Sequence, residues 1–246
     1  NVDSSVGTPG TFNSGSTAFT LSTFDSNSNK VVVVFYDSGN SNYGTAVVGT
    51  VSGTSISFGS ETVFESATVQ HLSVTFDSNS NKVVIAYSDT PNSEYGTAVV
   101  GTVSGTSISF GSPVVFNSGA TYFTAATFDS NSNKVVIAYR DAGNSGRGTA
   151  IVGTVSGTSI SFGSEVTYTT AGSSNYNGLT FDTTNNKVIL AYSDPDNSFY
   201  GTSRVGTVSG TSISFGTAVV FNSGSANVLS STYDSTNQKV VIAYRD

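Results

Sequence analysis

Aromatic and basic side chains recur at equivalent positions along this chain, and together they suit a site for a sugar or another polar, ring-shaped ligand. An aromatic face stacks on an apolar ring surface, while Arg, Asp and Asn hydrogen-bond the polar edge. The recurring candidates are Phe19, His71, Phe123 and Tyr176, with Val228 in the last copy; Arg140 and Arg245, with Tyr36, Ser88 and Ser193 in the other copies; and Tyr43, Tyr95, Arg147 and Tyr200. A second interpretation is that these rings only pack the loops that carry them, since exposed loops tolerate substitution.

An acidic residue recurs beside these sets. The equivalent residues are Asp37, Asp89, Asp141, Asp194 and Asp246, and in every copy except the last an Asn follows three residues later. An Asp in this setting commonly closes an Asx turn by accepting backbone N–H groups. A ring of carboxylates that binds a cation is the alternative. Asp89 and Asp141 therefore join the candidate ligand-binding residues.

A further acidic motif, Asp25-x-Asn27-x-Asn29, has the spacing that begins a calcium-binding loop. The Gly that such a loop requires is absent, Lys30 follows directly, and no Glu stands at the twelfth position. The motif is better interpreted as a plain hairpin turn. We expect no metal and no cofactor.

Catalysis has few candidates, because the chain has one His and no Cys. A zinc site with two or three His ligands is excluded, and a Ser-His-Asp triad would depend on His71 alone. A glycoside hydrolase needs only two carboxylates at a set separation. The acids that are specific to single copies form no evident pair; they are Glu61, Glu65, Glu94, Glu165 and Asp196. We expect no enzyme and keep a glycoside hydrolase as the third hypothesis.

These candidate residues are positioned by an internal repeat. Phe24-Asp25 recurs as an aromatic-Asp pair beginning at residues 76, 128, 181 and 233, at intervals of 52 or 53 residues. In the second copy, β-branched and aromatic residues predict strands over 70–77, 82–89, 95–103 and 107–116, which we name A, B, C and D in every unit. Asn, Ser and Gly predict tight A–B and C–D hairpins. The B–C and D–A connections read as longer, looser loops, and no segment reads as a helix.

The repeat predicts an all-β fold, a five-bladed β-propeller of four-stranded antiparallel blades in one domain over 1–246. The units cover approximately 12–63, 64–115, 116–167, 168–220 and 221–246, with an N-terminal strand over 1–11. That strand aligns with strand D, Val6 and Gly7 falling where Phe58 and Gly59 stand. The last blade is incomplete, since strand C would have to come from chain beyond Asp246 or from another segment.

The segment LSVTFDSNSNKVVIAYSDTPNS resembles the A–B half of blades in the NHL and YVTN families of propellers. The resemblance covers all five units, which are longer than the blades of those families. The sequence motifs NKVVIAYRD and GTVSGTSISFG are also similar to tandem repeats in structural or tail-associated proteins of marine viruses and bacteria. The first resemblance implies a β-propeller, and the second implies a structural or tail-associated repeat module.

Sequence variation between the copies is confined to one predicted face. GTVSGTSISFG is identical at 49–59, 101–111, 153–163 and 206–216, where it spans strand C, a turn and strand D. Antiparallel order places the A–B and C–D turns on one face and the B–C and D–A loops on the other. The variable loops carry the aromatic and basic sets, so this face is the predicted binding face, with similar pockets between neighbouring blades.

The amino-acid composition narrows the classes of molecule that the chain could bind. The 9 Lys and Arg against 16 Asp and Glu give a net charge of −7, which disfavours nucleic acid. No apolar run is long enough to span a membrane. We expect a non-catalytic recognition or display module that is extracellular or virion-associated, binds a glycan or cell-surface ligand, and is a monomer or part of a larger assembly. The alternative is a purely structural viral or cell-surface module with no small ligand.

Overall fold

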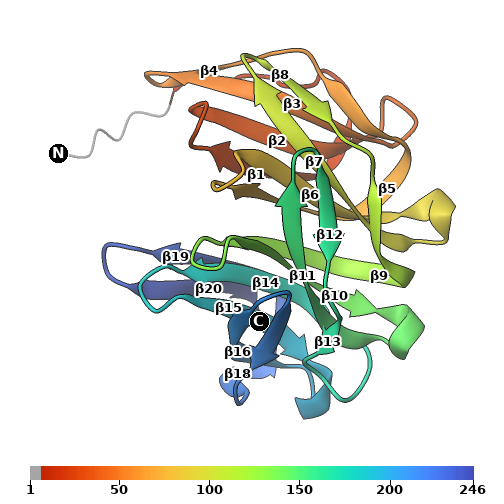
Figure 1. The fold of residues 1–246 in the computed structure, drawn as a ribbon, viewed down its shortest axis with the longest axis vertical. Helices are drawn as coiled ribbons and strands as arrows, with labels where there is room; N and C mark the ends of the chain where they lie inside the picture. The colour runs from red at the N-terminus through yellow and green to blue at the C-terminus, as the bar shows by residue number, and fades with distance from the viewer. Residues whose placement is uncertain (1–6) are drawn as a thin grey trace.

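The computed structural model describes residues 7–246, whose regular structure is β-strand apart from short 3₁₀ turns (Figure 1). The first unit contains β1 (Thr17–Asp25), β2 (Lys30–Asp37), β3 (Tyr43–Ser52) and β4 (Ser55–Phe58). The second contains β5 (Thr62–Asp77), β6 (Lys82–Asp89), η1 (Thr90–Asn92), β7 (Tyr95–Ser104) and β8 (Ser107–Phe110). The third contains β9 (Val114–Asp129), β10 (Lys134–Asp141), η2 (Ala142–Asn144), β11 (Arg147–Ser156) and β12 (Ser159–Phe162).

The fourth unit contains β13 (Val166–Thr167), β14 (Asn175–Asp182), β15 (Lys187–Asp194), η3 (Pro195–Asn197), β16 (Tyr200–Ser209) and β17 (Ser212–Phe215). The fifth contains β18 (Val219–Ser225), β19 (Asn227–Asp234) and β20 (Lys239–Arg245). Figure 1 shows the chain passing from the red first unit at the top, through the green third unit, to the blue β19 and β20 at the lower left. Within residues 7–246, none of the helices has the length or the apolar character of a membrane-spanning segment.

All strand pairs are antiparallel and follow chain order within a unit, so the all-β prediction is confirmed. In each of the first four units, strand B lies between strands A and C and pairs with both. In the second unit, β6 and β7 align from Val83 opposite Gly101 to Asp89 opposite Tyr95. Gly105 turns the chain into β8 with a φ of +61°, a conformation that favours glycine.

The prediction of loose D–A loops is wrong for the first two connections. β5 pairs with β3 over Thr62–Thr68 and with β6 over Val69–Asp77, so one continuous strand links two sheets. β9 does the same between β7 and β10. A continuous strand keeps the backbone N–H and C=O groups hydrogen-bonded while the chain crosses, which a loop would not. Between β13 and β14 the connection is irregular, as predicted.

The predicted N-terminal strand over 1–11 is only partly described, because residues 1–6, including Val6, lie outside the described residues. Residues 7–16 run along the first unit without forming a regular strand. Ser38 N donates to Ser16 O at 3.0 Å, which ties the end of this segment to the B–C connection of the first unit.

The hydrophobic core lies between neighbouring units. One cluster joins strands B and C of the first unit to strands B and C of the second; it includes Val32, Val34, Ala46, Val48, Val83, Ile85, Tyr87 and Val99. Two further clusters join the second unit to the third and the third to the fourth. Each sheet therefore buries its apolar face only against its neighbour, as expected for a repeat architecture.

An aromatic side chain from each strand D wedges between two units. The Phe64 ring, in the part of β5 that pairs with β3 of the first unit, lies 5.5 Å from the ring of Tyr87 and 5.7 Å from that of Phe110, both in the second unit. The equivalent pairs at later boundaries are Phe116–Tyr139, Tyr168–Tyr192 and Phe221–Tyr244, with centroids 5.1 to 5.3 Å apart. Tilted aromatic pairs at these distances are favourable.

We expect Gly111→Ala to lower the free energy of unfolding by about 1–3 kcal/mol, since overpacking forces the backbone to shift. A Cβ at Gly111 would lie 1.9 Å from the backbone oxygen of Thr158 in the next unit. The control is Gly105→Asn, because nothing lies within 4 Å of a Cβ there and Asn tolerates the left-handed conformation. Urea titrations of both variants decide the matter, and equal losses would contradict the tight approach between units.

Candidate functional site

Each strand A contains one residue whose backbone is left-handed, at the position of the first candidate set. The φ angles are +50° at Phe19, +50° at His71, +53° at Phe123, +53° at Tyr176 and +49° at Val228. The A–B pairing shifts register at each of these positions, as in a β-bulge. Such a conformation is uncommon for residues other than glycine and unusual for a β-branched Val. A bulge re-aims the side chain away from the regular sheet.

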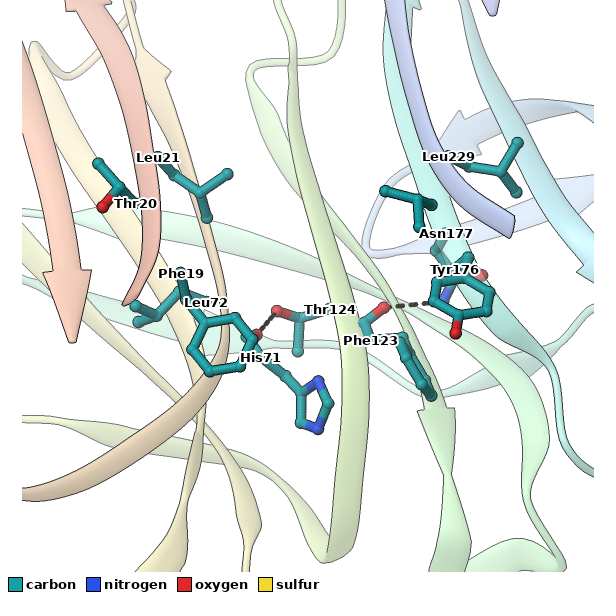
Figure 2. Close-up of a pocket in the computed structure, with 11 residues that line it drawn as sticks. Phe19, Thr20, Leu21, His71, Leu72, Phe123, Thr124, Tyr176, Asn177 and Leu229 are labelled. Carbon is teal, nitrogen blue, oxygen red and sulfur yellow. Dashed lines mark hydrogen bonds between the residues drawn. The ribbon is translucent and has the colours of Figure 1, made fainter. Parts of the chain in front are cut away.

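These side chains converge on one pocket of about 300 Å³ (Figure 2). The pocket is lined by strand A of all five units; the lining residues are Phe19, Thr20, Leu21, His71, Leu72, Phe123, Thr124, Tyr176, Asn177, Val228 and Leu229. Sequence analysis predicted separate pockets between neighbouring units. For the first candidate set, the bulge instead turns the side chains toward a space that the strands share. We call this space the axial pocket.

Adjacent units contact each other around the axial pocket. The rings of Phe19 and His71 lie 6.3 Å apart, those of His71 and Phe123 5.0 Å, and those of Phe123 and Tyr176 5.0 Å. Thr124 Oγ1 donates to the backbone oxygen of His71, and Asn177 Nδ2 donates to that of Phe123 at 2.9 Å (Figure 2). The pocket wall is therefore mainly aromatic and aliphatic.

A polar cluster, which we call the Arg140 cluster, lies beside the pocket and contacts its lining residue His71. Tyr122 Oη donates to Glu94 Oε2 at 2.5 Å, and the Arg140 guanidinium lies 5.4 Å from the centre of the Tyr122 ring. Arg140 Nη1 donates to Asn175 Oδ1 at 3.1 Å, and its buried Nε has no partner. The rings of His71 and Tyr122 are 5.3 Å apart. The cluster thus brings a cation, a carboxylate and a phenol to the aromatic rim.

Within residues 7–246, the Arg140 cluster occurs once, and its members come from the second, third and fourth units. The equivalents of Tyr122 are Ala18, Gln70, Asn175 and Asn227. Sequence analysis identified His71 and Arg140 but missed Tyr122, which precedes a candidate residue in a segment assigned to a loop. The signal that could have found it is the single aromatic residue at a position that is otherwise small or amidic.

The pKa of His71 lies below its usual value of 6.5, first because burial disfavours the imidazolium. The charge of Glu94 opposes this shift, while the charge of Arg140 adds to it. The imidazole is consequently neutral at pH 7, with one nitrogen able to donate and one able to accept a hydrogen bond. The pKa of the Tyr122 hydroxyl is raised, chiefly by its hydrogen bond to Glu94.

The other predicted ligand-binding residues lie away from the axial pocket. Tyr43, Tyr95, Arg147 and Tyr200 each begin strand C and do not line it. Arg147 Nε donates to the backbone oxygen of Thr170 at 3.1 Å. Arg245 is exposed near the end of the chain, in β20. Of the candidate sets, the structure therefore brings only the first to the axial pocket.

Three of the recurring Asp residues, Asp37, Asp141 and Asp194, close turns. Asp37 Oδ1 accepts the Gly39 N–H at 2.9 Å, and Asp141 Oδ1 accepts that of Asn144 at 3.2 Å. Asp141 also accepts from Asn117 Nδ2 at 3.1 Å. The pKa of Asp89 is raised by burial. In the A–B turns, Asp25 likewise accepts backbone N–H groups, so its carboxylate serves the hairpin.

The acids specific to single units are engaged separately. Glu65 accepts from Tyr87 Oη at 3.1 Å, and Glu165 accepts from Tyr139 Oη at 2.8 Å. Asp196 Oδ2 accepts the Thr170 N–H at 2.7 Å. Within residues 7–246, three or more His, Asp or Glu side chains do not gather in a group that could hold a metal ion.

We expect the imidazole of His71, the single His, to titrate below pH 6.5 in proton NMR. Glu94→Gln should lower this pKa further, and Arg140→Gln should raise it, because each removes the charge that acts on the ring. Since the unfolded chain binds the proton more tightly, folding stability should fall as the pH drops below 6.5, and His71→Phe should reduce this loss. A wild-type pKa at or above 6.5 would contradict the burial described here.

Comparison with known proteins leaves the function to be argued from this geometry. No protein-family model matches the chain, and no curated protein matches its sequence. The arrangement itself combines an aromatic pocket with hydrogen-bonding groups on one side. Those features suit binding of a small ligand that has one apolar face and one polar edge.

Proposed function

We propose that the chain is a five-bladed β-propeller that serves as a non-catalytic recognition module and binds a glycan in the axial pocket. The ring arrangement is supported by the order in which the A strands pack: β1 beside β5, β5 beside β9, β9 beside β14, and β14 beside β19. It is supported also by the way all five A strands line one pocket. The resemblance to NHL and YVTN blades agrees with this topology.

The observation that carries the proposal is the left-handed backbone repeated at Phe19, His71, Phe123, Tyr176 and Val228. A non-glycine residue in this region costs roughly 1–2 kcal/mol. Strain of this kind persists where the surrounding structure enforces it and gathers at ligand sites. Here it aims four rings into a common space, an arrangement that a purely structural spacer does not need.

A sugar suits the pocket better than a wholly apolar ligand. The rings can stack on the apolar face of a pyranose, and the volume of about 300 Å³ is at the lower end for small-ligand sites. The Arg140 cluster meets the pocket where Tyr122 contacts His71, so Arg140 and Tyr122 can hydrogen-bond hydroxyl groups of a sugar that extends beyond the pocket. Because the five units share one pocket, we expect one ligand per chain.

The proposed location of the protein follows from where glycans occur. Glycans are displayed on cell surfaces and in secretions, so we propose an extracellular or virion-associated module. The net charge of −7 agrees with a neutral or cationic ligand rather than with a polyanion. The separate acidic side chains described above support recognition without hydrolysis.

The test is a glycan array followed by calorimetry with purified protein. Phe123→Ala should weaken binding roughly tenfold, because one stacking ring is lost. The matched control carries Tyr43→Ala, Tyr95→Ala and Tyr200→Ala, which remove three rings outside the pocket and should leave affinity unchanged.

Three other results of this test would each favour a different site or function. Loss of binding in the control alone would move the site to the starts of strand C. A blank array from folded protein would favour a structural module with no small ligand. Turnover of a glycan that one acidic substitution abolishes would favour a glycoside hydrolase.

A further inference from the structure

Hydrogen bonds cross two of the boundaries between successive A strands around the axial pocket. Thr124 Oγ1, in the third unit, donates to the backbone oxygen of His71 in the second. Asn177 Nδ2, in the fourth unit, donates to the backbone oxygen of Phe123 in the third at 2.9 Å. In both bonds the acceptor is the carbonyl of the left-handed bulge residue, and the donor is the residue that follows the bulge in the next unit.

Among the residues that the structure describes, the other two boundaries between successive units lack this bond. The position that follows the bulge is Leu72 in the second unit and Leu229 in the fifth. A Leu side chain has no hydrogen-bond donor, so the carbonyl oxygens of Phe19 and Tyr176 receive no such bond from the next unit. All four residues line the axial pocket.

The two residues without the bond stand at opposite ends of the row of rings. Ring contacts run from Phe19 to His71, from His71 to Phe123, and from Phe123 to Tyr176. Figure 2 shows Phe19 on one side of the pocket and Tyr176 on the other, with the Thr124 bond between them. The pocket therefore places two separate backbone acceptors on either side of its bridged middle.

A bound ligand has to answer to these acceptors. A ligand that displaces water from a carbonyl without replacing the hydrogen bond loses affinity, whereas a ligand group that donates keeps it. Because the wall around both carbonyls is aromatic and aliphatic, the donor has to come from the ligand. A site that leaves a backbone group unpaired in this way discriminates strongly between a ligand with a hydroxyl group and one without it.

We propose that the carbonyl oxygens of Phe19 and Tyr176 select the sugar, each by accepting a hydrogen bond from a different hydroxyl group of one neutral pyranose. This inference rests on the proposed function and narrows its ligand class. A carbonyl oxygen only accepts, so an ether or a carboxylate at either position is rejected. The lining residues within 7–246 include no Asp, Glu, Lys or Arg, so a charged group buried there would have no partner.

The test uses substitutions that differ by one hydroxyl group. Leu229→Thr places a donor beside the Tyr176 carbonyl, as Thr124 does beside that of His71, while Leu229→Val has the same shape without the donor. We expect the Thr variant to bind sugar about tenfold more weakly than the Val variant, because its hydroxyl group occupies the carbonyl. Leu72→Thr and Leu72→Val make the same comparison at Phe19.

The probes are methyl hexopyranosides of gluco, galacto and manno configuration, titrated against the intact protein by NMR. The monodeoxy analogues of the sugar that binds best follow. In the wild type, removal of the hydroxyl group should weaken binding about tenfold at two ring positions. Leu229→Thr should abolish the loss at one position and Leu72→Thr the loss at the other, which is the coupling that a double-mutant cycle measures.

The results separate this inference from the proposed function. Equal affinities of the Thr and Val variants, or a wild type that tolerates every deoxy analogue, would overturn the inference and leave glycan binding intact. A wild type that binds none of the probes would also overturn it, and a blank glycan array in addition would overturn the proposed function. Thermal melts check folding, and the deoxy series on the wild type decides the matter even if a variant is unfolded.

Discussion

Burial between neighbouring sheets is the constraint on which this structure depends. A four-stranded sheet with apolar side chains on both faces cannot bury them alone, so each unit is stable only against the next. At each boundary an aromatic side chain of strand D packs between two units. Phe64, for example, contacts Tyr87 and Phe110. The glycines of strand C follow from the wedge, since Gly44 leaves room for the Phe64 ring. This explains why GTVSGTSISFG stays constant while other segments vary: its side chains and turns meet the neighbouring unit.

The same packing brings the strand A bulges together. Because the A strands of neighbouring units pack side by side, identical bulges point to one space rather than to five separate pockets. The residue types at the bulges are then free to differ, because the left-handed backbone is common to Phe, His, Tyr and Val there. The repeated bulge gives the pocket its shape, and residues that occur in a single copy, such as Tyr122, place polar groups beside it.

Most strands and turns could be predicted from the sequence, because they depend on the preferences of neighbouring residues. Strand B of the second unit is observed at Lys82–Asp89 as predicted, and strand C is one residue longer than predicted. The Asx turns followed from the Asp residues alone. The continuous strands β5 and β9 could not be predicted, because Ser66 in β5 and residues 117–119 (Asn-Ser-Gly) in β9 favour loops unless strands on both sides supply hydrogen bonds. Nor could the bulges, since no propensity favours Phe or Val at a positive φ.

The central claim is that the repeated units surround one axis instead of forming a linear stack. The chain has no Cys, so spin labels can be attached at pairs of engineered Cys in the exposed A–B turns, at Ser26 with Thr183 and at Ser26 with Ser235. A ring predicts that the Ser26–Ser235 distance, although it spans one more unit, is no longer than the Ser26–Thr183 distance. A linear stack would make Ser26–Ser235 the longer distance, and that result would contradict the axial pocket and the proposal built on it.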